Sequence, residues 1–223
     1  TLDSHGVAAY DFSIEDSATF DFNQSWLPDP SRYKLTLLHI GSLATIVEPG
    51  ASVLYDWAMK CAEFAPIVFD PNVRPSVLGD RDRYLRVVEK WVEISTVVKV
   101  SEDDLEWLFP EISPLEAAKK WVADGVALVL LTRGAAGLMA ITANEVMEHA
   151  GVTVDVVDTV GAGDSVGAII AEAIVKDGLF NLHGENLRTM LNCAALAAAI
   201  TCSRVGAEPP TKRELRDALE ERV

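Results

Sequence analysis

Residues 155–167 read Asp155-Val-Val-Asp-Thr-Val-Gly-Ala-Gly-Asp-Ser-Val-Gly167, and this stretch decides the fold. A β-branched run leads into a glycine-rich turn, and the apolar residues that follow have the i, i+3, i+4, i+7 spacing of an amphipathic helix. Gly161 and Gly163 permit positive φ and close backbone approach, and the unpaired N–H groups of a first helical turn favour an anion. The stretch therefore predicts a strand, a glycine loop and a helix with an anion site between them.

The same alternation of apolar runs and helical patterns extends in both directions and is typical of buried parallel strands joined by crossover helices. The expected strands are residues 35–40, 66–70, 96–100, 126–132, 138–141, 145–149 and 154–157. The expected helices are residues 51–64, 80–93, 102–108, 114–123, 162–177, 185–202 and 211–221. The fold class is therefore α/β, and without a repeat or linker composition a second independent domain is not supported.

Residues 7–22 follow a different pattern, with apolar residues at alternate positions on both sides of a turn at 15–17. This pattern predicts a β-hairpin with one apolar face. Two strands alone are marginal in water, so the face must be covered by the main body, a ligand or another subunit. Pairing with the same hairpin of a second subunit predicts a homodimer. We expect residues 1–25 to form part of a β lid and residues 26–223 to form the main α/β domain.

Composition excludes several classes of function. The 19 Lys and Arg against 34 Asp and Glu give a net charge of −15, which opposes broad contact with nucleic acid or an anionic membrane. Cys61, Cys193 and Cys202 are too widely spaced for a disulfide framework, so a reducing cytoplasm is expected. No apolar run reaches the length of a membrane span. Because the chain opens at Thr1 without Met, we expect an upstream segment to be missing.

Asp164 stands in the first turn of the helix predicted for residues 162–177, and two interpretations of it remain open. The carboxylate can cap the helix, which is the common role of Asp at such a place. Alternatively it is a general base that accepts a hydroxyl proton beside the anion site, while the amides stabilise a phosphoryl group.

Rival motifs at the same place are weaker. Gly163-Asp-Ser165-Val-Gly167 matches the GxSxG pattern of serine hydrolases, but downstream of Ser165 the only histidine is His183, which leaves little chain for a triad. A dinucleotide fingerprint fails because its third glycine is replaced by Val166, and no Gly-Lys dipeptide forms a Walker A loop. His39 has no metal-ligand spacing to another histidine and is interpreted as a packing residue of its strand.

Four segments together resemble the ribokinase-like, or PfkB, family of carbohydrate kinases. These are DTVGAGD at 158–164, DPNVRP at 70–75, LTRGAAG at 131–137 and CSRVGAEP at 202–209. The resemblance spans nearly the whole chain and is greatest to bacterial fructokinases. It implies a three-layer α/β/α sandwich with a β lid and an ATP-dependent sugar kinase. A 2-keto-3-deoxygluconate kinase or another sugar kinase of the family is the alternative, and a nucleotide-binding subunit without turnover is an alternative of another class.

The resemblance also implies roles for single residues. Asp164 is expected to deprotonate the sugar hydroxyl, and Gly161, Ala162 and Gly163 to form the anion hole. The residues expected at sugar or phosphate are Asn72, Arg74, Asp158 and Thr159. The residues expected around ATP are Ser101, Thr132, Gly134, Gly137 and Asn192. Asp158, Val160, Ser203 and Gly206 resemble an oxygen-only site for K⁺.

The chain departs from the family pattern in two places. Many relatives carry Asn-x-x-Glu to organise Mg²⁺ and phosphates, whereas this chain reads Ser101-Glu-Asp-Asp104. Asp104 is expected to hold Mg²⁺ through water, although an acidic helical first turn explains the same residues. The family's N-terminal strand, with its substrate-binding Asp and half of the lid, has no counterpart in the sequence, which puts the sugar site in doubt.

Overall fold

The computed structural model describes residues 12, 14 and 17–221 and contains one mixed sheet of six strands in the order β1-β2-β3-β4-β5-β6. The strands are β1 (Leu38–Gly41), β2 (Ile67–Asp70), β3 (Val97–Ser101), β4 (Leu128–Thr132), β5 (Leu138–Ile141) and β6 (Val146–His149). Strands β1 to β4 are parallel, and β5 and β6 join antiparallel. The β5–β6 connection, residues 142–145, is too short for a crossover, so these two strands form a hairpin.

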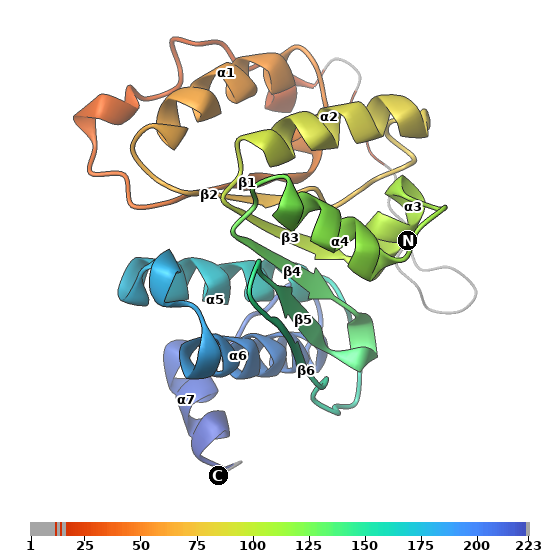
Figure 1. The fold of residues 1–223 in the computed structure, drawn as a ribbon, viewed down its shortest axis with the longest axis vertical. Coiled ribbons are helices and arrows are strands. Elements are labelled where there is room, and N and C mark those ends of the chain that lie inside the picture. The colour runs from red at the N-terminus through yellow and green to blue at the C-terminus, as the bar shows by residue number, and fades with distance from the viewer. Residues whose placement is uncertain (1–11, 13, 15–16, 222–223) are drawn as a thin grey trace.

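Helices cover both faces of the sheet and make three layers (Figure 1). The helices are α1 (Gly50–Ala62), α2 (Arg81–Glu93), α3 (Glu102–Leu108), α4 (Pro114–Ala123), α5 (Ala162–Asp177), α6 (Gly184–Cys202) and α7 (Lys212–Glu220). Helices α1 to α4 bury their apolar residues in one cluster with the sheet, and α5 and α6 bury theirs in a second cluster on the other face. The expected three-layer α/β/α architecture is confirmed.

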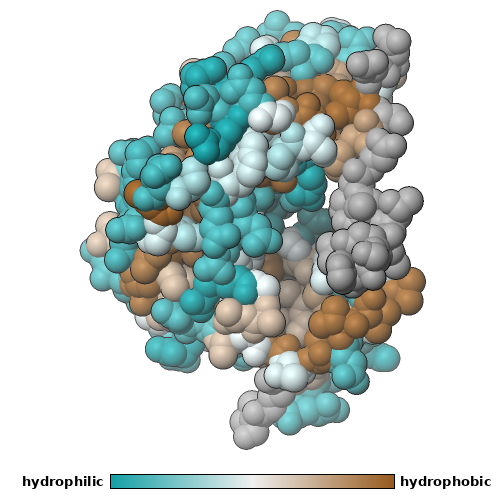
Figure 2. All heavy atoms as spheres, turned by 90° about the vertical axis from the view of Figure 1, so that its right-hand side faces the viewer, coloured by the Kyte–Doolittle hydropathy of each residue, from teal (hydrophilic) through white to brown (hydrophobic). Residues whose placement is uncertain are grey.

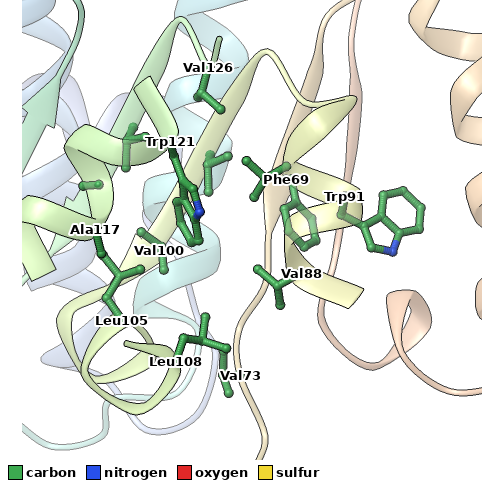
Figure 3. Packing of buried hydrophobic residues seen from close by; sticks show 14 of the residues in the cluster. Phe69, Val73, Val88, Trp91, Val100, Leu105, Leu108, Ala117, Trp121 and Val126 are labelled. Atoms are coloured by element: carbon green, nitrogen blue, oxygen red, sulfur yellow. The ribbon is translucent and has the colours of Figure 1, made fainter. Parts of the chain in front are cut away.

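The strands divide their side chains between the two clusters because successive residues of a strand point to opposite faces. On β2, Phe69 enters the first cluster and Val68 the second, and on β3 Val98 and Val97 divide in the same way. Figure 3 shows the first cluster, in which Phe69 packs beside the stacked ring of Trp91. Strands buried on both faces explain the continuous apolar runs in the sequence.

Two of the expected strands are wrong. Residues 154–157 form no strand; Val156 and Val157 are exposed, and Val156 lines a cavity. Ala18–Phe20 forms a 3-10 helix in place of the second hairpin strand. Residues 7–11 of the expected first strand lie outside the described residues. The other expected strands and helices are present, with ends shifted by up to three residues.

Hydrophilic residues cover much of the face shown in Figure 2, with hydrophobic residues gathered in separate patches. Within the part of the chain that the structure describes, no helix has the length and apolar character to cross a membrane.

Candidate active site

The first turn of α5 forms the centre of the site. Gly161 is the N-cap residue in a left-handed conformation (φ 83°), and no side chain caps this helix. The interpretation of Asp164 as a helix cap is therefore wrong. Its carboxylate is exposed and makes no hydrogen bond or ion pair with any described residue. Among the described residues the N–H groups of Gly161 and Gly163 have no partner, whereas that of Ala162 donates to the carbonyl of Thr159 (3.3 Å). The turn thus offers free N–H groups together with an unpartnered carboxylate, which suits an anion and a transferable proton side by side.

Asp164 borders a cavity of about 170 Å³ at the carboxyl ends of β1 and β2. This is the edge at which open α/β sheets bind ligands. The lining residues are His39, Ile40, Gly41, Ser42, Asp70, Asn72 and Asp164. Of these, only Asn72 and Asp164 were expected from sequence. His39, interpreted as a packing residue, lies exposed on β1 with its ring against Gly167 of α5, so that interpretation is incomplete.

The same cavity contains two residues with unfavourable backbone conformations. Ser42 has φ 56° and Asn72 has φ 41°, and they are the described non-glycine residues with positive φ. Each such conformation costs on the order of 1–3 kcal/mol and persists where the surrounding structure requires it, most often at functional sites. A Cβ on Gly41 would lie 1.9 Å from the carbonyl oxygen of Asp70, so only glycine fits there. The backbone around this cavity is therefore held in a specific shape.

Hydrogen bonds with residues of α3 and α2 hold the segment that follows β2 in place. Asp104 accepts hydrogen bonds from the backbone N–H of Val73 (2.9 Å) and of Ser101 (3.2 Å). Burial raises the pKa of the Asp104 carboxyl, while its hydrogen bonds with Ser101 lower it. These hydrogen bonds give Asp104 a structural role, and its expected role toward Mg²⁺ through water stays a prediction. Arg74 donates from its guanidinium to the carbonyl of Val73 (3.0 Å) and is not among the residues that line the two cavities, so its expected contact with sugar or phosphate stays a prediction.

A second cavity, of about 380 Å³, lies on the other side of the α5 turn. Its walls come from β4, the β4–β5 turn, residues 151–156, α5 and α6, and they are mostly apolar. The expected site residues on its wall are Thr132, Gly134, Gly137, Thr159, Ala162 and Gly163. Ser101 and Asn192 are not among the lining residues. Asn192 lies one turn of α6 before Ala195, which does line the cavity, and Ser101 caps α3.

Three glycines on the wall of this cavity have different structural roles. Gly134 has φ 52° and open space around it, so its role is conformational. A Cβ on Gly137 would lie 2.2 Å from the carbonyl oxygen of His149, so Gly137 is needed for packing inside the sheet edge. Gly163 has no positive φ, and a Cβ there would lie 2.7 Å from Nζ of Lys99. Gly163 therefore makes room for a buried ammonium.

Lys99 and Asp70 form a buried ion pair that the sequence analysis missed. Nζ of Lys99 lies 2.8 Å from Oδ2 of Asp70, and both side chains are less than a tenth exposed. The sequence carried one signal for this pair: a lysine stands inside the apolar run 96–100, and the preceding predicted strand ends in Asp70. The pair lies behind Gly163, between the two cavities.

Asp158 joins the glycine loop to the segment after α6. One carboxylate oxygen accepts from the N–H of Val160 and the other from the N–H of Gly206, each at 3.0 Å. These hydrogen bonds, that of Val160 foremost, lower the pKa of the Asp158 carboxyl. The expected K⁺ residues Asp158, Val160 and Gly206 therefore lie together. Ser203 is in the same segment, and its hydroxyl donates to the carbonyl of Ile200 (2.8 Å), which leaves its own carbonyl as the expected ligand.

Ser165 is not placed as a nucleophile. Its side chain is buried, and its hydroxyl is within 3.0 Å of the carbonyl oxygen of Gly161 and 2.7 Å of the hydroxyl of Thr201. His183 precedes α6, beyond the opposite end of α5 from Ser165. The serine hydrolase interpretation has no support in this geometry.

Comparisons with known proteins agree with the geometry. The profile described as pfkB family carbohydrate kinase matches residues 4–213. The chain is 30% identical over 175 residues to a fructokinase of Rhizobium leguminosarum bv. trifolii, which covers 78% of this chain and 53% of the relative. It is 33% identical over 174 residues to a fructokinase of Vibrio alginolyticus, with 76% and 55% covered. The chain thus spans about half the length of these curated relatives.

Solved structures share the fold. A fructokinase from Xylella fastidiosa with bound ATP superposes with TM-score 0.84 at 22% identity, covering 96% of this chain and 70% of that one. A fructokinase double mutant from Vibrio cholerae O395, in a form bound to fructose, ADP and potassium ion, gives TM-score 0.80 at 24% identity, covering 95% and 67%. Since the family profile matches nearly the whole sequence and the glycine loop with Asp164 lies at the centre of the site, the chain belongs to the pfkB family of carbohydrate kinases.

Proposed function

We propose that the protein is an ATP-dependent sugar kinase, and specifically a fructokinase. The observation that carries this proposal is the unpartnered carboxylate of Asp164 in the uncapped first turn of α5, with one cavity on each side of the turn. Membership of the family and similarity to fructokinases support the choice of acceptor.

The two cavities differ in a way that suggests their occupants. The larger one, of about 380 Å³, is mostly apolar and suits the base and ribose of ATP. The smaller one has a larger polar share of its lining, with Ser42, Asn72 and Asp164 on its wall, and suits a polyhydroxylated sugar. Their common border is the α5 turn, because Gly163 lines the larger cavity and Asp164 the smaller. The γ-phosphoryl group then lies at the turn.

In the proposed reaction, Asp164 accepts the proton of one sugar hydroxyl, and the oxygen so activated attacks the γ-phosphorus of ATP. The bond between the γ-phosphorus and its bridging oxygen breaks, and ADP leaves with that electron pair. The N–H groups of Gly161, Ala162 and Gly163 are close to the negative charge that spreads over the phosphoryl oxygens. Asp158 holds the preceding loop to Gly206 and so fixes where this turn begins.

We propose two metal ions, Mg²⁺ and K⁺, and the observations that support each are different. The described residues contain no group of three or more His, Cys, Asp or Glu that could hold a metal, so Mg²⁺ would be held mainly by ATP phosphates and water. Asp104 is already committed to Val73 and Ser101. A K⁺ ion would be held near Asp158, Val160 and Gly206, where a carboxylate and two loops converge and oxygen ligands are available.

Other parts of the proposal rest on sequence. A 2-keto-3-deoxygluconate kinase shares the same motifs, and an assay across sugars separates it from a fructokinase. Three further expectations stay predictions: a lid at residues 1–25, a main domain at 26–223 and a homodimer. Light scattering tests the homodimer.

A cytoplasmic location is inferred from the three cysteines, all of which are free thiols.

The proposal is tested by replacing Asp164→Asn, which keeps the size of the side chain but removes the proton acceptor. Turnover is expected to fall by roughly 10² to 10⁴, while ATP affinity and melting temperature persist. Asp177→Asn at the other end of α5 is the matched control, because it makes the same charge change far from the turn. Near-wild-type sugar phosphorylation by the Asp164 variant contradicts the assigned base. Nucleotide binding by the wild type without phosphorylation of any sugar favours the non-catalytic alternative.

A further inference from the structure

Lys99 is a charged residue in the interior of the sheet. It lies on β3, where Val98 and Val100 face the α1–α4 layer, so its side chain points toward the α5–α6 layer. Only 5% of the residue is exposed. Burying a lysine is unfavourable unless its charge is matched, so its place requires an explanation.

Ion pairing with Asp70 explains only part of this arrangement. An ammonium has three donors, yet Oδ2 of Asp70 is the one hydrogen-bond acceptor of Lys99 among the described residues. The other oxygen, Oδ1 of Asp70, is buried without any partner there. A buried pair that served stability alone would be expected to have its donors and acceptors filled, because each unfilled group costs free energy.

The position of the ammonium points to a role at the α5 turn. Nζ would be 2.7 Å from a Cβ on Gly163, so it packs directly against the residue that separates the two cavities. Asp70, at the end of β2, is one of the residues that line the smaller cavity. The pair is therefore a dipole with its positive end against the first turn of α5. In a poorly solvated place such a charge acts strongly over a few ångströms.

We propose that Lys99 is a positioning residue for phosphoryl transfer: its ammonium, held behind Gly163 by Asp70, adds positive potential to the amides of the α5 turn and stabilises the phosphoryl group in transfer. This inference rests on the proposed function. Gly163 is then needed because a side chain there would displace the ammonium. Lys99 acts through the turn and not by contact with the sugar, since it lines neither cavity.

The test compares two variants that share one change. Asp70→Asn keeps Lys99 and still offers its side chain a hydrogen-bond acceptor. Lys99→Met combined with Asp70→Asn removes the ammonium and leaves no buried charge, so the fold is expected to survive. The turnover number of the double variant is expected to be about 10²- to 10³-fold below that of Asp70→Asn, with sugar KM little changed. Lys120→Met with Glu89→Gln, which replaces an exposed ion pair, is the matched control and keeps wild-type turnover.

Calorimetry of nucleotide binding adds a readout that needs no sugar. With MgCl₂ present, the wild type is expected to bind AMP-PNP more tightly than ADP, and the double variant is expected to lose that preference while it keeps its affinity for ADP. A purely structural role of Lys99 would not change this preference. If the double variant does not fold, Lys99→Gln is measured in its place. Its amide can donate to Asp70, and it removes the ammonium charge.

Two results overturn the role of Lys99. One is a double variant whose turnover and AMP-PNP preference match those of Asp70→Asn. The other is a wild-type protein that binds AMP-PNP no more tightly than ADP. A wild type that prefers AMP-PNP but phosphorylates no sugar has a different meaning, because it contradicts the sugar kinase proposal and leaves the role of Lys99 toward the phosphoryl group intact.

Discussion

The carboxylate of Asp104 lies 2.9 Å from the backbone N–H of Val73, a residue 31 positions earlier in the chain. Its other oxygen accepts from Ser101, so one side chain both caps α3 and holds the segment after β2. That segment contains Asn72, which lines the smaller cavity. A residue outside the cavity therefore sets the shape of its wall.

Replacing Asp104→Ala is expected to lower the free energy of unfolding by about 1–3 kcal/mol, because two backbone N–H groups lose their acceptors. The segment with Asn72 is also released, so the KM for sugar should rise more than the KM for ATP. Chemical denaturation and steady-state kinetics measure both effects. Asp103→Ala, an exposed neighbour in the same turn, is the control, with a change of about 0.5 kcal/mol or less. Equal effects of the two variants would contradict the anchoring role.

Hydrophobic periodicity predicted most of the fold because it reports burial. Helices α3, α4 and α5 and strand β5 have the expected bounds, since each is amphipathic or fully buried between clear turn residues. Residues 154–157 have the β-branched composition of a strand but lie beside a cavity with no neighbouring strand to pair with. Pairing depends on the rest of the fold, which a local pattern does not contain.

The site was predicted in part for a similar reason. The glycine loop and Asp164 were found because a contiguous motif carries them. Lys99 and Ser42 lie in separate segments outside the quoted motifs, and only the sheet brings Lys99 to Asp70, whose own segment gave no sign of a buried partner. Arg74 was assigned to a contact with ligand by resemblance alone, and that contact stays a prediction; its guanidinium donates to the carbonyl of Val73 in its own loop.

Two glycines of the larger cavity should respond differently to the same substitution. Gly137→Ala places a Cβ 2.2 Å from a backbone oxygen at φ 98°, so a loss of about 2 kcal/mol or more in unfolding free energy is expected. Gly134→Ala meets no atom within 4 Å and is strained only by φ 52°, so a loss of about 1 kcal/mol is expected. Thermal unfolding of the two variants side by side tests the ranking, and the reverse order would refute it.

Ser165→Ala separates the kinase from the hydrolase interpretation. The variant removes a buried hydroxyl that bonds to Thr201, and Thr201 keeps its bond to the carbonyl of Ala197. We expect a loss of about 1 kcal/mol of stability and nearly unchanged sugar phosphorylation. A serine-directed phosphonate should leave the wild type unlabelled, and stoichiometric labelling of Ser165 would revive the hydrolase.

Asp158 should make stability depend on pH in acid solution. Its hydrogen bonds with Val160 and Gly206 hold its pKa below the ordinary value of 3.8 in the folded protein. Ionised Asp158 therefore stabilises the fold fully above pH 3.8, and this contribution is lost as pH falls through the lowered pKa. The melting-temperature difference between wild type and Asp158→Asn should shrink from about pH 6 to about pH 3. A melting-temperature difference that stays constant or grows would be inconsistent with stabilisation by these two hydrogen bonds.

The assignment of the larger cavity to ATP is tested on α6. Ala198 lines that cavity and is partly exposed, so the larger side chain of Ala198→Leu should occupy the space without overpacking the core. ATP affinity is expected to fall at least about tenfold, which corresponds to about 1.4 kcal/mol, with little change in melting temperature. Asn192→Leu introduces the same side chain on the same helix, outside the lining residues, and should leave ATP affinity unchanged. Calorimetric titration of both variants decides the matter: equal losses would restore Asn192 to the nucleotide site, and no loss in either would place ATP elsewhere on the molecule.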